Sequence, residues 1–308
     1  MPPDGSTPAS MSDELPFVIQ PPGDASVAAG AARSAAATWG LPEPEHLRTG
    51  MNALFVAGDD VILRVSCTTA PAEQAVWLMS QLRRLGVMVP RQLRDGPLIV
   101  DDLAVFAIER LYPAGAVDWA TVGAMTRRVH DWSAADVVGR YPLPRCEDFP
   151  WWNTTRAVAD VDDLLDEPAR HGLVATIAAH GGWSDQVTTR AVCHGDVHPG
   201  NVVQTSAGPV LIDWDLLCHA PTAWDHATLM TWTTRWGGDL TMYARYAQGY
   251  GQSMLGDPVA ESVAIMRNVI ATLMRLKVGR TNPAAAEEAQ RRLRFWRGDP
   301  DAPQWVAQ

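Results

Sequence analysis

Lysine is almost missing from this chain of 308 residues, because Lys277 is its only lysine among 25 lysines and arginines. The phosphate-binding loop that ends in Lys-Ser or Lys-Thr is therefore excluded. The glycine-rich pattern GxGxxG is absent as well, which removes the usual dinucleotide fingerprint. Phosphate contacts in this protein would have to come from arginine or from backbone N–H groups.

Long apolar runs and a cysteine pairing pattern are also lacking. The longest apolar stretches are broken by charges or prolines, so we expect no transmembrane helix, and we expect no signal peptide because no basic region precedes an apolar one. The four cysteines without close spacing are typical of reduced thiols in a cytoplasmic protein. A net charge of −10 argues against nucleic acid and a membrane surface as partners, and it is compatible with a cationic small substrate.

The first third of the chain predicts a small lobe. Residues 1–24 are rich in proline and lack apolar periodicity, so they indicate a flexible tail. Within residues 25–110, alternation and turn signals predict an antiparallel sheet and one helix, which lies between the second and the third strand. The expected strands are 52–57, 61–65, 98–101 and 104–109, and the expected helix is 72–86.

Residues 111–308 predict a second, mostly helical lobe. Large apolar side chains recur at helical spacing from Trp119 to Trp132, which indicates the first of its helices. Further helices are expected at 154–170, 222–235, 239–254, 259–279 and 284–296. Short strands are expected at 191–193, 202–204 and 210–213, so the whole chain is predicted to be an α+β protein with two lobes.

One stretch carries the chemistry. An apolar strand leads into His194-Gly-Asp196, Asn201 follows five residues later, and a second apolar run delivers Asp213. Phosphoryl transfer needs a carboxylate that orients a hydroxyl and accepts its proton, which predicts Asp196 as the catalytic base. Mg²⁺ prefers oxygen ligands, which predicts Asn201 and Asp213 as its ligands.

This pattern, His-Gly-Asp-x-His-x-x-Asn followed by Ile-Asp-Trp-Asp, resembles the aminoglycoside phosphotransferase family, including its choline-kinase-like and homoserine-kinase-like relatives. The resemblance implies a bilobal protein-kinase-like fold with a catalytic β-hairpin, and ATP or GTP with Mg²⁺ as cofactors. It also implies structural roles at the site for His194, His198 and Asp225.

In the small lobe the resemblance implies nucleotide contacts. Arg64 stands where kinases place the phosphate-binding lysine, and Glu73 at the start of the following helix is its expected ion-pair partner. Met51 and Asn52 are candidates for phosphate contact. The segment from Glu109 to Leu111 would supply backbone hydrogen bonds to the base.

The acceptor would be a hydroxyl on a small molecule, such as an antibiotic of the aminoglycoside kind, a sugar or an amino alcohol. Asp215, Trp232 and Trp236 are candidates for binding it, since sugars, planar rings and cations all pack on tryptophan. Residues 25–110 are therefore predicted to bind nucleotide and residues 111–308 to hold catalysis and acceptor.

Two other functions remain open from the sequence. A kinase-like nucleotide-binding regulator without activity is compatible with the loose phosphate loop and the missing lysine. A metallohydrolase could use His194, Asp196 and His198 as metal ligands, but it would leave Asn201 and Asp213 unexplained.

Overall fold

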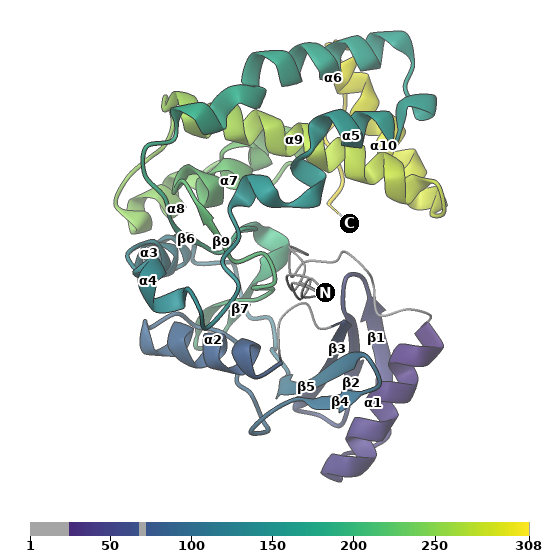
Figure 1. The fold of residues 1–308 in the computed structure, drawn as a ribbon, viewed down its shortest axis with the longest axis vertical. Coiled ribbons are helices and arrows are strands. Elements are labelled where there is room, and N and C mark those ends of the chain that lie inside the picture. The colour runs from purple at the N-terminus through teal and green to yellow at the C-terminus, as the bar shows by residue number, and fades with distance from the viewer. Residues whose placement is uncertain (1–24, 68–71, 308) are drawn as a thin grey trace, which may run out of the picture.

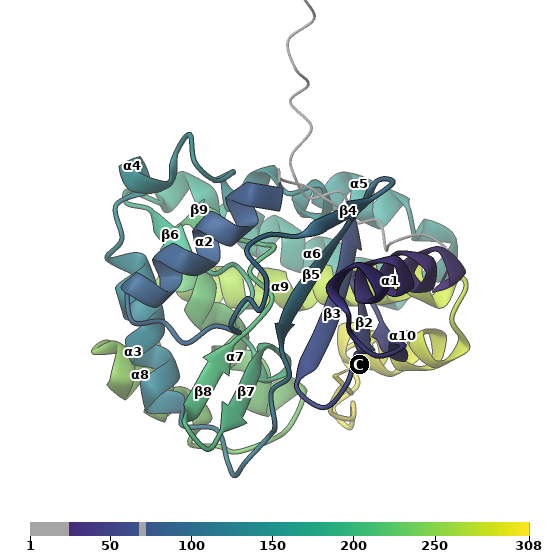
Figure 2. The same ribbon diagram turned by 90° about the horizontal axis from the view of Figure 1, so that it is seen from below.

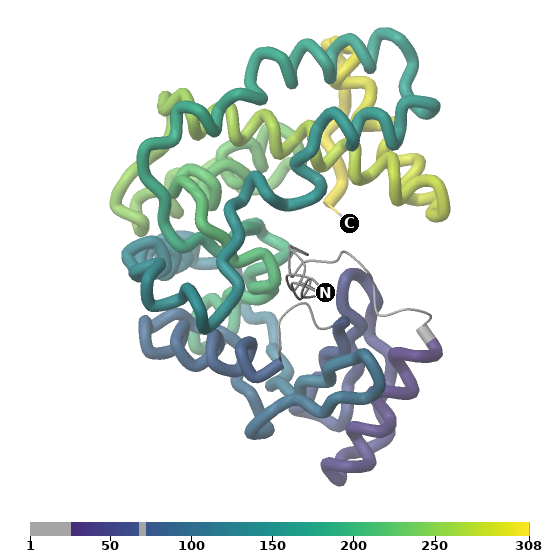
Figure 3. Tube along the Cα trace, viewed as in Figure 1, coloured from purple at the N-terminus to yellow at the C-terminus, as the bar shows by residue number. Residues whose placement is uncertain are grey.

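The computed structural model describes residues 25–67 and 72–307, so the tail predicted at 1–24 lies outside it. Two lobes are stacked along the longest axis of the molecule (Figure 1). The chain runs from the sheet-rich lobe into the helical lobe, as the trace in Figure 3 shows. The predicted α+β, kinase-like arrangement with a small antiparallel sheet is confirmed.

The small lobe is built on one antiparallel sheet with strand order β1-β2-β3-β5-β4. Its strands are β1 Glu45–Thr49, β2 Ala53–Val56, β3 Val61–Cys67, β4 Leu98–Val100 and β5 Leu103–Glu109. Arg64 is the central residue of β3 and pairs with Leu54 on one side and Phe106 on the other. This register fixes Arg64 in the middle of the sheet, where the backbone of both neighbouring strands holds it.

The helix α1 (Ala25–Trp39) was not predicted, and with it the small lobe has two helices rather than one. Alanines at helical spacing form its buried face: Ala28, Ala31, Ala32, Ala35 and Ala36. Their small side chains let the helix lie close against the sheet, where they pack in one cluster with Phe55 and Leu63 (Figure 2). Strand β1 was missed as well, because every one of its residues is exposed and no apolar alternation marks it.

The second helix of this part of the chain, α2 (Ala72–Arg84), was predicted within two residues. Its buried side chains Leu78 and Leu82 do not pack in the core of the sheet. They join a cluster with Met125 of α3 (Trp119–His130) and Leu211 of the catalytic hairpin. The helix therefore ties the small lobe to the large one.

The large lobe consists of helices around a small β-structure. The helices are α3 Trp119–His130, α4 Ala134–Val137, α5 Thr154–Ala159, α6 Glu167–His180, α7 Ala223–Arg235, α8 Met242–Tyr250, α9 Pro258–Gly279 and α10 Pro283–Trp296. Two strand pairs form its β-structure: β6 Ala191–Cys193 with β9 Cys218–Ala220, and β7 Val202–Thr205 with β8 Gly208–Leu211. The predicted hairpin is present, whereas β9 was not foreseen.

The single helix predicted at 154–170 was wrong. The structure has α5, a 3₁₀ turn at Asp162–Leu164, and then α6. Asp166 starts α6 because its carboxylate accepts a hydrogen bond from the N–H of Ala169, and Pro168 occupies the first turn. An aspartate followed closely by proline is a helix start, and that signal outweighs the apolar periodicity.

Across the described ranges, no helix is both long and apolar enough to cross a membrane. All four cysteines lie in the described ranges, and none of them forms a disulfide bond.

Candidate active site

Asp225 of α7 fixes the loop that contains His194, Gly195 and Asp196, here called the catalytic loop. The backbone N–H groups of His194 and Gly195 donate to its two carboxylate oxygens, at 2.8 and 2.9 Å. Nε2 of His130 lies 3.0 Å from the same carboxylate, and Nδ1 of His130 lies 2.9 Å from the Tyr250 hydroxyl. Burial alone would raise the pKa of Asp225, but the hydrogen bonds from His130 and the loop hold it below its usual value. The loop is therefore anchored by a buried, ionised carboxylate.

Glycine is required at position 195. Its φ of +95° lies in the left-handed region, and a Cβ there would come within 1.9 Å of the carbonyl oxygen of Leu216. Its own carbonyl accepts hydrogen bonds from Nε1 of Trp224 and Nη1 of Arg267, both at 3.0 Å. The turn that presents Asp196 is thus fixed by glycine geometry and by two donors from the helical lobe.

Asp196 projects from this turn into the cleft between the lobes. Its carboxylate contacts Nη2 of Arg267 at 2.6 Å and Nε2 of His198 at 3.3 Å. Burial would raise its pKa, but His198 and Arg267 outweigh burial and hold the pKa of Asp196 well below its usual range. The side chain is therefore ionised, as a group that orients a hydroxyl and accepts its proton must be.

The two histidines of the motif have different surroundings. His194 is buried, its Nδ1 accepts from the N–H of Asp196 at 3.2 Å, and its Nε2–H donates to the carbonyl of Ile212 at 3.1 Å. Burial lowers the pKa of His194, so its ring is neutral and connects the loop to the hairpin through these two hydrogen bonds. His198 faces the cleft, and its ring stacks on Trp232 with centroids 5.6 Å apart.

Asn201 directly precedes strand β7 and Asp213 follows strand β8, so both lie at the open end of this hairpin. Nδ2 of Asn201 donates to the carbonyl and the carboxylate of Asp196, at 3.0 and 3.3 Å. The N–H of Ile212 donates to the carbonyl of Asn201 at 3.0 Å, which brings Asp213 next to this asparagine. Asp213 has a positive φ of +64°, an uncommon conformation that aspartate tolerates better than most residues. Burial and the nearby Asp215 raise the pKa of Asp213 to about 6.

Arg64 crosses from the small lobe to this site. Its guanidinium forms an ion pair with Asp215, and Nδ2 of Asn52 donates to the same carboxylate oxygen at 3.1 Å. The ion pair predicted between Arg64 and Glu73 is therefore corrected. The reason is the placement of Arg64 at the centre of β3, facing the cleft, whereas Glu73 is exposed at the start of α2. Asp215, a candidate for binding the acceptor, contacts these small-lobe residues and also lines the cleft.

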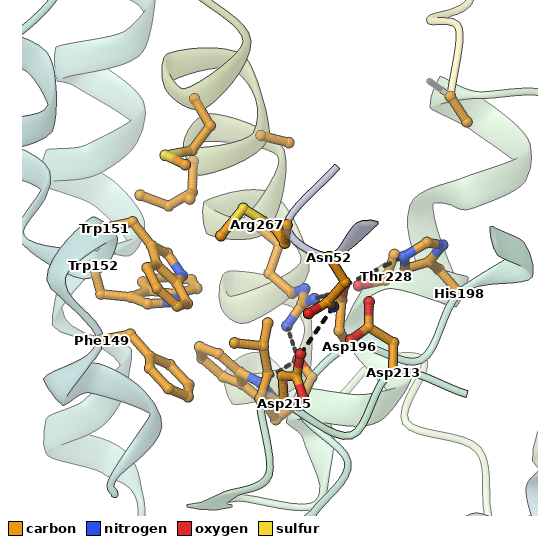
Figure 4. Close-up of a pocket in the computed structure, with 18 of the residues that line it drawn as sticks. Asn52, Phe149, Trp151, Trp152, Asp196, His198, Asp213, Asp215, Thr228 and Arg267 are labelled. Carbon is orange, nitrogen blue, oxygen red and sulfur yellow. Dashed lines mark hydrogen bonds and ion pairs between the residues drawn. The ribbon is translucent and has the colours of Figure 1, made fainter. Parts of the chain in front are cut away.

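A cleft of about 510 Å³ joins these groups (Figure 4). Of the predicted residues, it is lined by Met51, Asn52, Arg64, Asp196, His198, Asp213, Asp215, Trp232 and Trp236. Glu109 and Leu111 are not among its lining residues, and the N–H of Glu109 already donates to the carbonyl of Arg91 at 2.9 Å. Their contact with a base stays a prediction.

The sequence did not reveal several residues of this cleft. Arg267 is the most important of them, since it contacts Asp196 from a helix that follows 71 residues later. Phe149, Trp151, Trp152 and Thr228 were missed as lining residues too. The available signal was weak: the tryptophans were noticed, but nothing in their spacing separated cleft from core.

Three features together define a kinase-like phosphotransferase. They are the sheet-rich lobe, Asp196 on a loop anchored by Asp225, and Asn201 and Asp213 on one hairpin. A family model described as the phosphotransferase enzyme family, APH, matches residues 54–264, which is more than half of the chain. The chain belongs to this family. The predicted family and enzyme class, a small-molecule phosphotransferase with an alcohol group as acceptor, are thereby confirmed.

Solved structures support the fold at low sequence identity. Spectinomycin phosphotransferase in complex with ADP and spectinomycin has 12% identity and a TM-score of 0.63, covering 83% of this chain and 89% of its own. APH(2″) in complex with GDP and kanamycin has 15% identity and a TM-score of 0.66, covering 84% and 94%. A choline/ethanolamine kinase family protein from Mesorhizobium loti has 18% identity and a TM-score of 0.55, covering 84% and 89%. No curated protein matches the chain.

Proposed function

We propose that this protein transfers the terminal phosphoryl group of ATP or GTP to a hydroxyl group of a small molecule. Asp196 is the catalytic base, and Asn201 and Asp213 hold Mg²⁺. The observation that carries the proposal is that Asp196 and Asp213 both line the cleft and Asn201 donates hydrogen bonds to Asp196, on a loop anchored by Asp225.

The reaction requires little covalent chemistry from the protein. The hydroxyl oxygen of the acceptor forms a bond to the terminal phosphorus, the bond from phosphorus to the bridging oxygen breaks, and the electron pair leaves with the nucleoside diphosphate. The hydroxyl proton passes to Asp196. Because Asp196 is ionised and fixed by Arg267, its main contribution is to hold the hydroxyl in line for attack.

The hairpin residues fit a magnesium site. Asp213 and Asp215 are close enough that burial and mutual repulsion raise the pKa of Asp213 to about 6, and a divalent cation would relieve this repulsion. The amide nitrogen of Asn201 is bonded to Asp196, which leaves its amide oxygen as a ligand. Bound there, Mg²⁺ would neutralise charge on the phosphates.

The nucleotide would bind against residues 25–110 and the acceptor against residues 111–308. Arg64 would bind phosphate from the centre of the sheet, with Met51 and Asn52 beside it, and the base would reach the segment from Glu109 to Leu111. Structural neighbours bound to ADP, GDP and AMP-PNP support a nucleoside triphosphate as donor. Neighbours named for spectinomycin, kanamycin and choline/ethanolamine support a small-molecule acceptor, and an antibiotic acceptor would make the protein a resistance enzyme.

The two other functions are less well supported. A regulator without activity has no need for an ionised Asp196 that projects into the cleft and is held by Arg267 beside His198. A metallohydrolase would need a free ring nitrogen on His194, and both of its nitrogens are engaged with backbone groups.

The test is turnover of ATP and of GTP across a panel of alcohols, with wild type and Asp196→Asn. We expect the variant to bind Mg-nucleotide like wild type and to lose roughly 10²–10⁴-fold in kcat. Asp136→Asn, an exposed position on α4, is the matched control and should retain full turnover. Near-wild-type turnover of Asp196→Asn on a true acceptor would refute the assignment.

A further inference from the structure

The acceptor side of the cleft is lined by aromatic rings. Phe149, Trp151, Trp152 and Trp224, here called the aromatic wall, line this cavity; Phe149 and Trp224 are buried, so Trp151 and Trp152 present its accessible ring surface. The rings of Phe149 and Trp151 are stacked at 4.7 Å with an interplanar angle of 7°, and Trp152 and Trp224 are 4.7 Å apart. Figure 4 shows Phe149, Trp151 and Trp152 together on one side, away from Asp196 and Asp213. Flat aromatic surfaces of this kind bind planar rings by stacking.

The charges around the aromatic wall disfavour a polycation. Among the described residues that line the cleft, the carboxylates are those of Asp196, Asp213 and Asp215, all at the phosphoryl-transfer centre. The helical side contributes arginines instead, namely Arg267, Arg275 and Arg292. An acceptor with several ammonium groups would have to place them beside guanidinium groups without a carboxylate to pair with, which is unfavourable at short range.

Two of the tryptophans in the cleft already have a cation over the ring. The guanidinium of Arg267 lies over the ring of Trp224 at 5.2 Å, and that of Arg292 lies over Trp236 at 5.9 Å. A quaternary ammonium would compete with these arginines for the same faces. At these two rings a cationic acceptor would displace an arginine, and no described lining residue on the acceptor side offers it a carboxylate, which favours an uncharged ring.

On the side of the cleft next to His198 (Figure 4), the hydroxyl of Thr228 has no hydrogen-bond partner among the described residues. The Thr228 side chain lines the cleft and is only 9% exposed. Thr228 lies one helical turn before Trp232, whose ring stacks on His198 of the catalytic loop. A buried hydroxyl that lacks a partner is costly unless a ligand supplies one. This threonine is placed to bond a polar group of the acceptor close to the reacting hydroxyl.

We propose that the acceptor is an alcohol with an uncharged planar aromatic ring, which stacks on the aromatic wall while a polar substituent bonds to Thr228. The proposal rests on the phosphotransferase function above and narrows its substrate class. It separates this chain from polycationic aminoglycosides and from choline as acceptors.

Binding to the protein loaded with Mg²⁺ and a non-hydrolysable ATP or GTP analogue tests the ring preference. The probes are 2-(2-naphthyl)ethanol, 2-phenylethanol, 2-cyclohexylethanol, kanamycin and choline, measured by calorimetry or ligand-observed NMR. Affinity should rise from the cyclohexyl to the phenyl to the naphthyl alcohol, with kanamycin and choline weakest. Tighter binding of kanamycin or choline than of the naphthyl alcohol, equal affinity of the three ring alcohols, or no binding of any of them would overturn the proposal.

Variants locate the ring. Trp151→Ala should weaken the naphthyl alcohol about tenfold or more, since an aromatic contact and its buried area are lost together. Thr228→Val, which keeps the shape, should weaken an acceptor with a hydrogen-bonding substituent, such as chloramphenicol, and leave the naphthyl alcohol unchanged. Trp39→Ala, at the end of α1 and outside the cleft lining, is the control and should change neither. Unchanged naphthyl affinity in Trp151→Ala would place the ring elsewhere and refute the wall.

The failure of this proposal can be told apart from failure of the proposed function. Mg-dependent nucleotide binding and phosphoryl transfer in wild type and Asp196→Asn report on the function alone. If kanamycin is phosphorylated better than every aromatic alcohol, the function stands and the substrate class is wrong. If aromatic alcohols bind by stacking but no nucleotide binds, the class of ligand stands and the function is wrong.

Discussion

The phosphoryl-transfer half of the cleft and its aromatic half are built in opposite ways. The first comes from one stretch, residues 194–215, whose N–H groups donate hydrogen bonds to Asp225 and whose oxygen atoms accept hydrogen bonds from Trp224 and Arg267. The second is assembled from a turn near residue 150, from α7 and from α9, and it depends on ring packing. The difference teaches that the chemistry is specified locally, whereas acceptor choice depends on packing between distant segments and can change without disturbing the chemistry.

Asp213→Asn should distinguish the two halves most strongly, because it should impair phosphoryl transfer and leave acceptor binding nearly unchanged. The variant keeps the size of the side chain and removes the charge that would hold Mg²⁺ on the phosphates. We expect kcat to fall about 10³-fold, equivalent to roughly 4 kcal/mol, and Mg-dependent nucleotide affinity to weaken. Affinity for 2-(2-naphthyl)ethanol should change less than about twofold. Unchanged calorimetric affinity for Mg-ATP and Mg-GTP would argue against Asp213 as a ligand.

A smaller effect, but one on both halves, is expected for Asp225→Asn, because α7 carries both the brace and part of the aromatic wall. The amide cannot accept from the loop N–H groups and from His130 as the carboxylate does. Loss of a buried, paired charge should lower the free energy of unfolding by about 3 kcal/mol. Urea unfolding measures this, and kcat should fall in the same variant. A variant as stable as wild type would show that the brace contributes little.

Arg64 tests whether the nucleotide side is linked to the hairpin as the structure indicates. Arg64→Ala should raise the KM for nucleotide about ten- to a hundredfold and lower kcat, because the contact persists into the transition state. Arg64→Lys should recover only part of the loss, since a point charge replaces a planar fork.

A double-mutant cycle then identifies the partner of Arg64. Combined with Asp215→Ala, the losses should be less than additive, because the two side chains form one ion pair. Combined with Glu73→Ala, they should add. Coupling to Glu73 and not to Asp215 would restore the partner predicted from the sequence.

The smallest effect on activity is expected at His226 of α7, where the helix packs against tyrosines of α8. Burial lowers the pKa of His226 to about 3, below the value near 6.5 of an unfolded histidine. Between those values the unfolded chain binds one more proton, so this residue makes stability fall as the pH drops from about 6.5 towards 3. The slope for one proton is about 1.4 kcal/mol per pH unit.

His226→Phe should remove that slope while keeping a ring against Tyr250, which lies 4.4 Å away at 90°. Urea unfolding at several values between pH 4 and 6.5 measures the difference between variant and wild type. Parallel pH profiles for the two proteins would mean that His226 is protonated in the folded state.

The elements that were predicted well are those with strong local patterns. Strands β2, β3 and β5 are short apolar runs bounded by turn residues. Helices α9 and α10 begin at Asp-Pro and Asn-Pro and were placed within one residue. Helix α1 was missed because alanines carry its buried face, and alanine gives little apolar contrast. The turn at Asp162–Leu164 was missed because apolar residues continue through it.

The sequence by itself brings together the residues of the proposed reaction centre. His194, Asp196, Asn201 and Asp213 lie on one loop and its hairpin, so their spacing along the chain fixes their spacing in space, and the chemistry follows from the residue types.

Only the tertiary structure decided what surrounds that centre. In the folded protein Arg64 forms its ion pair with Asp215 and not with Glu73. Arg267 contacts Asp196 from a separate helix, and Trp151 and Thr228 line the cleft. These contacts join residues far apart in the chain. They depend on how helices and sheet pack, and no local pattern encodes which side chain a given packing brings to a given place.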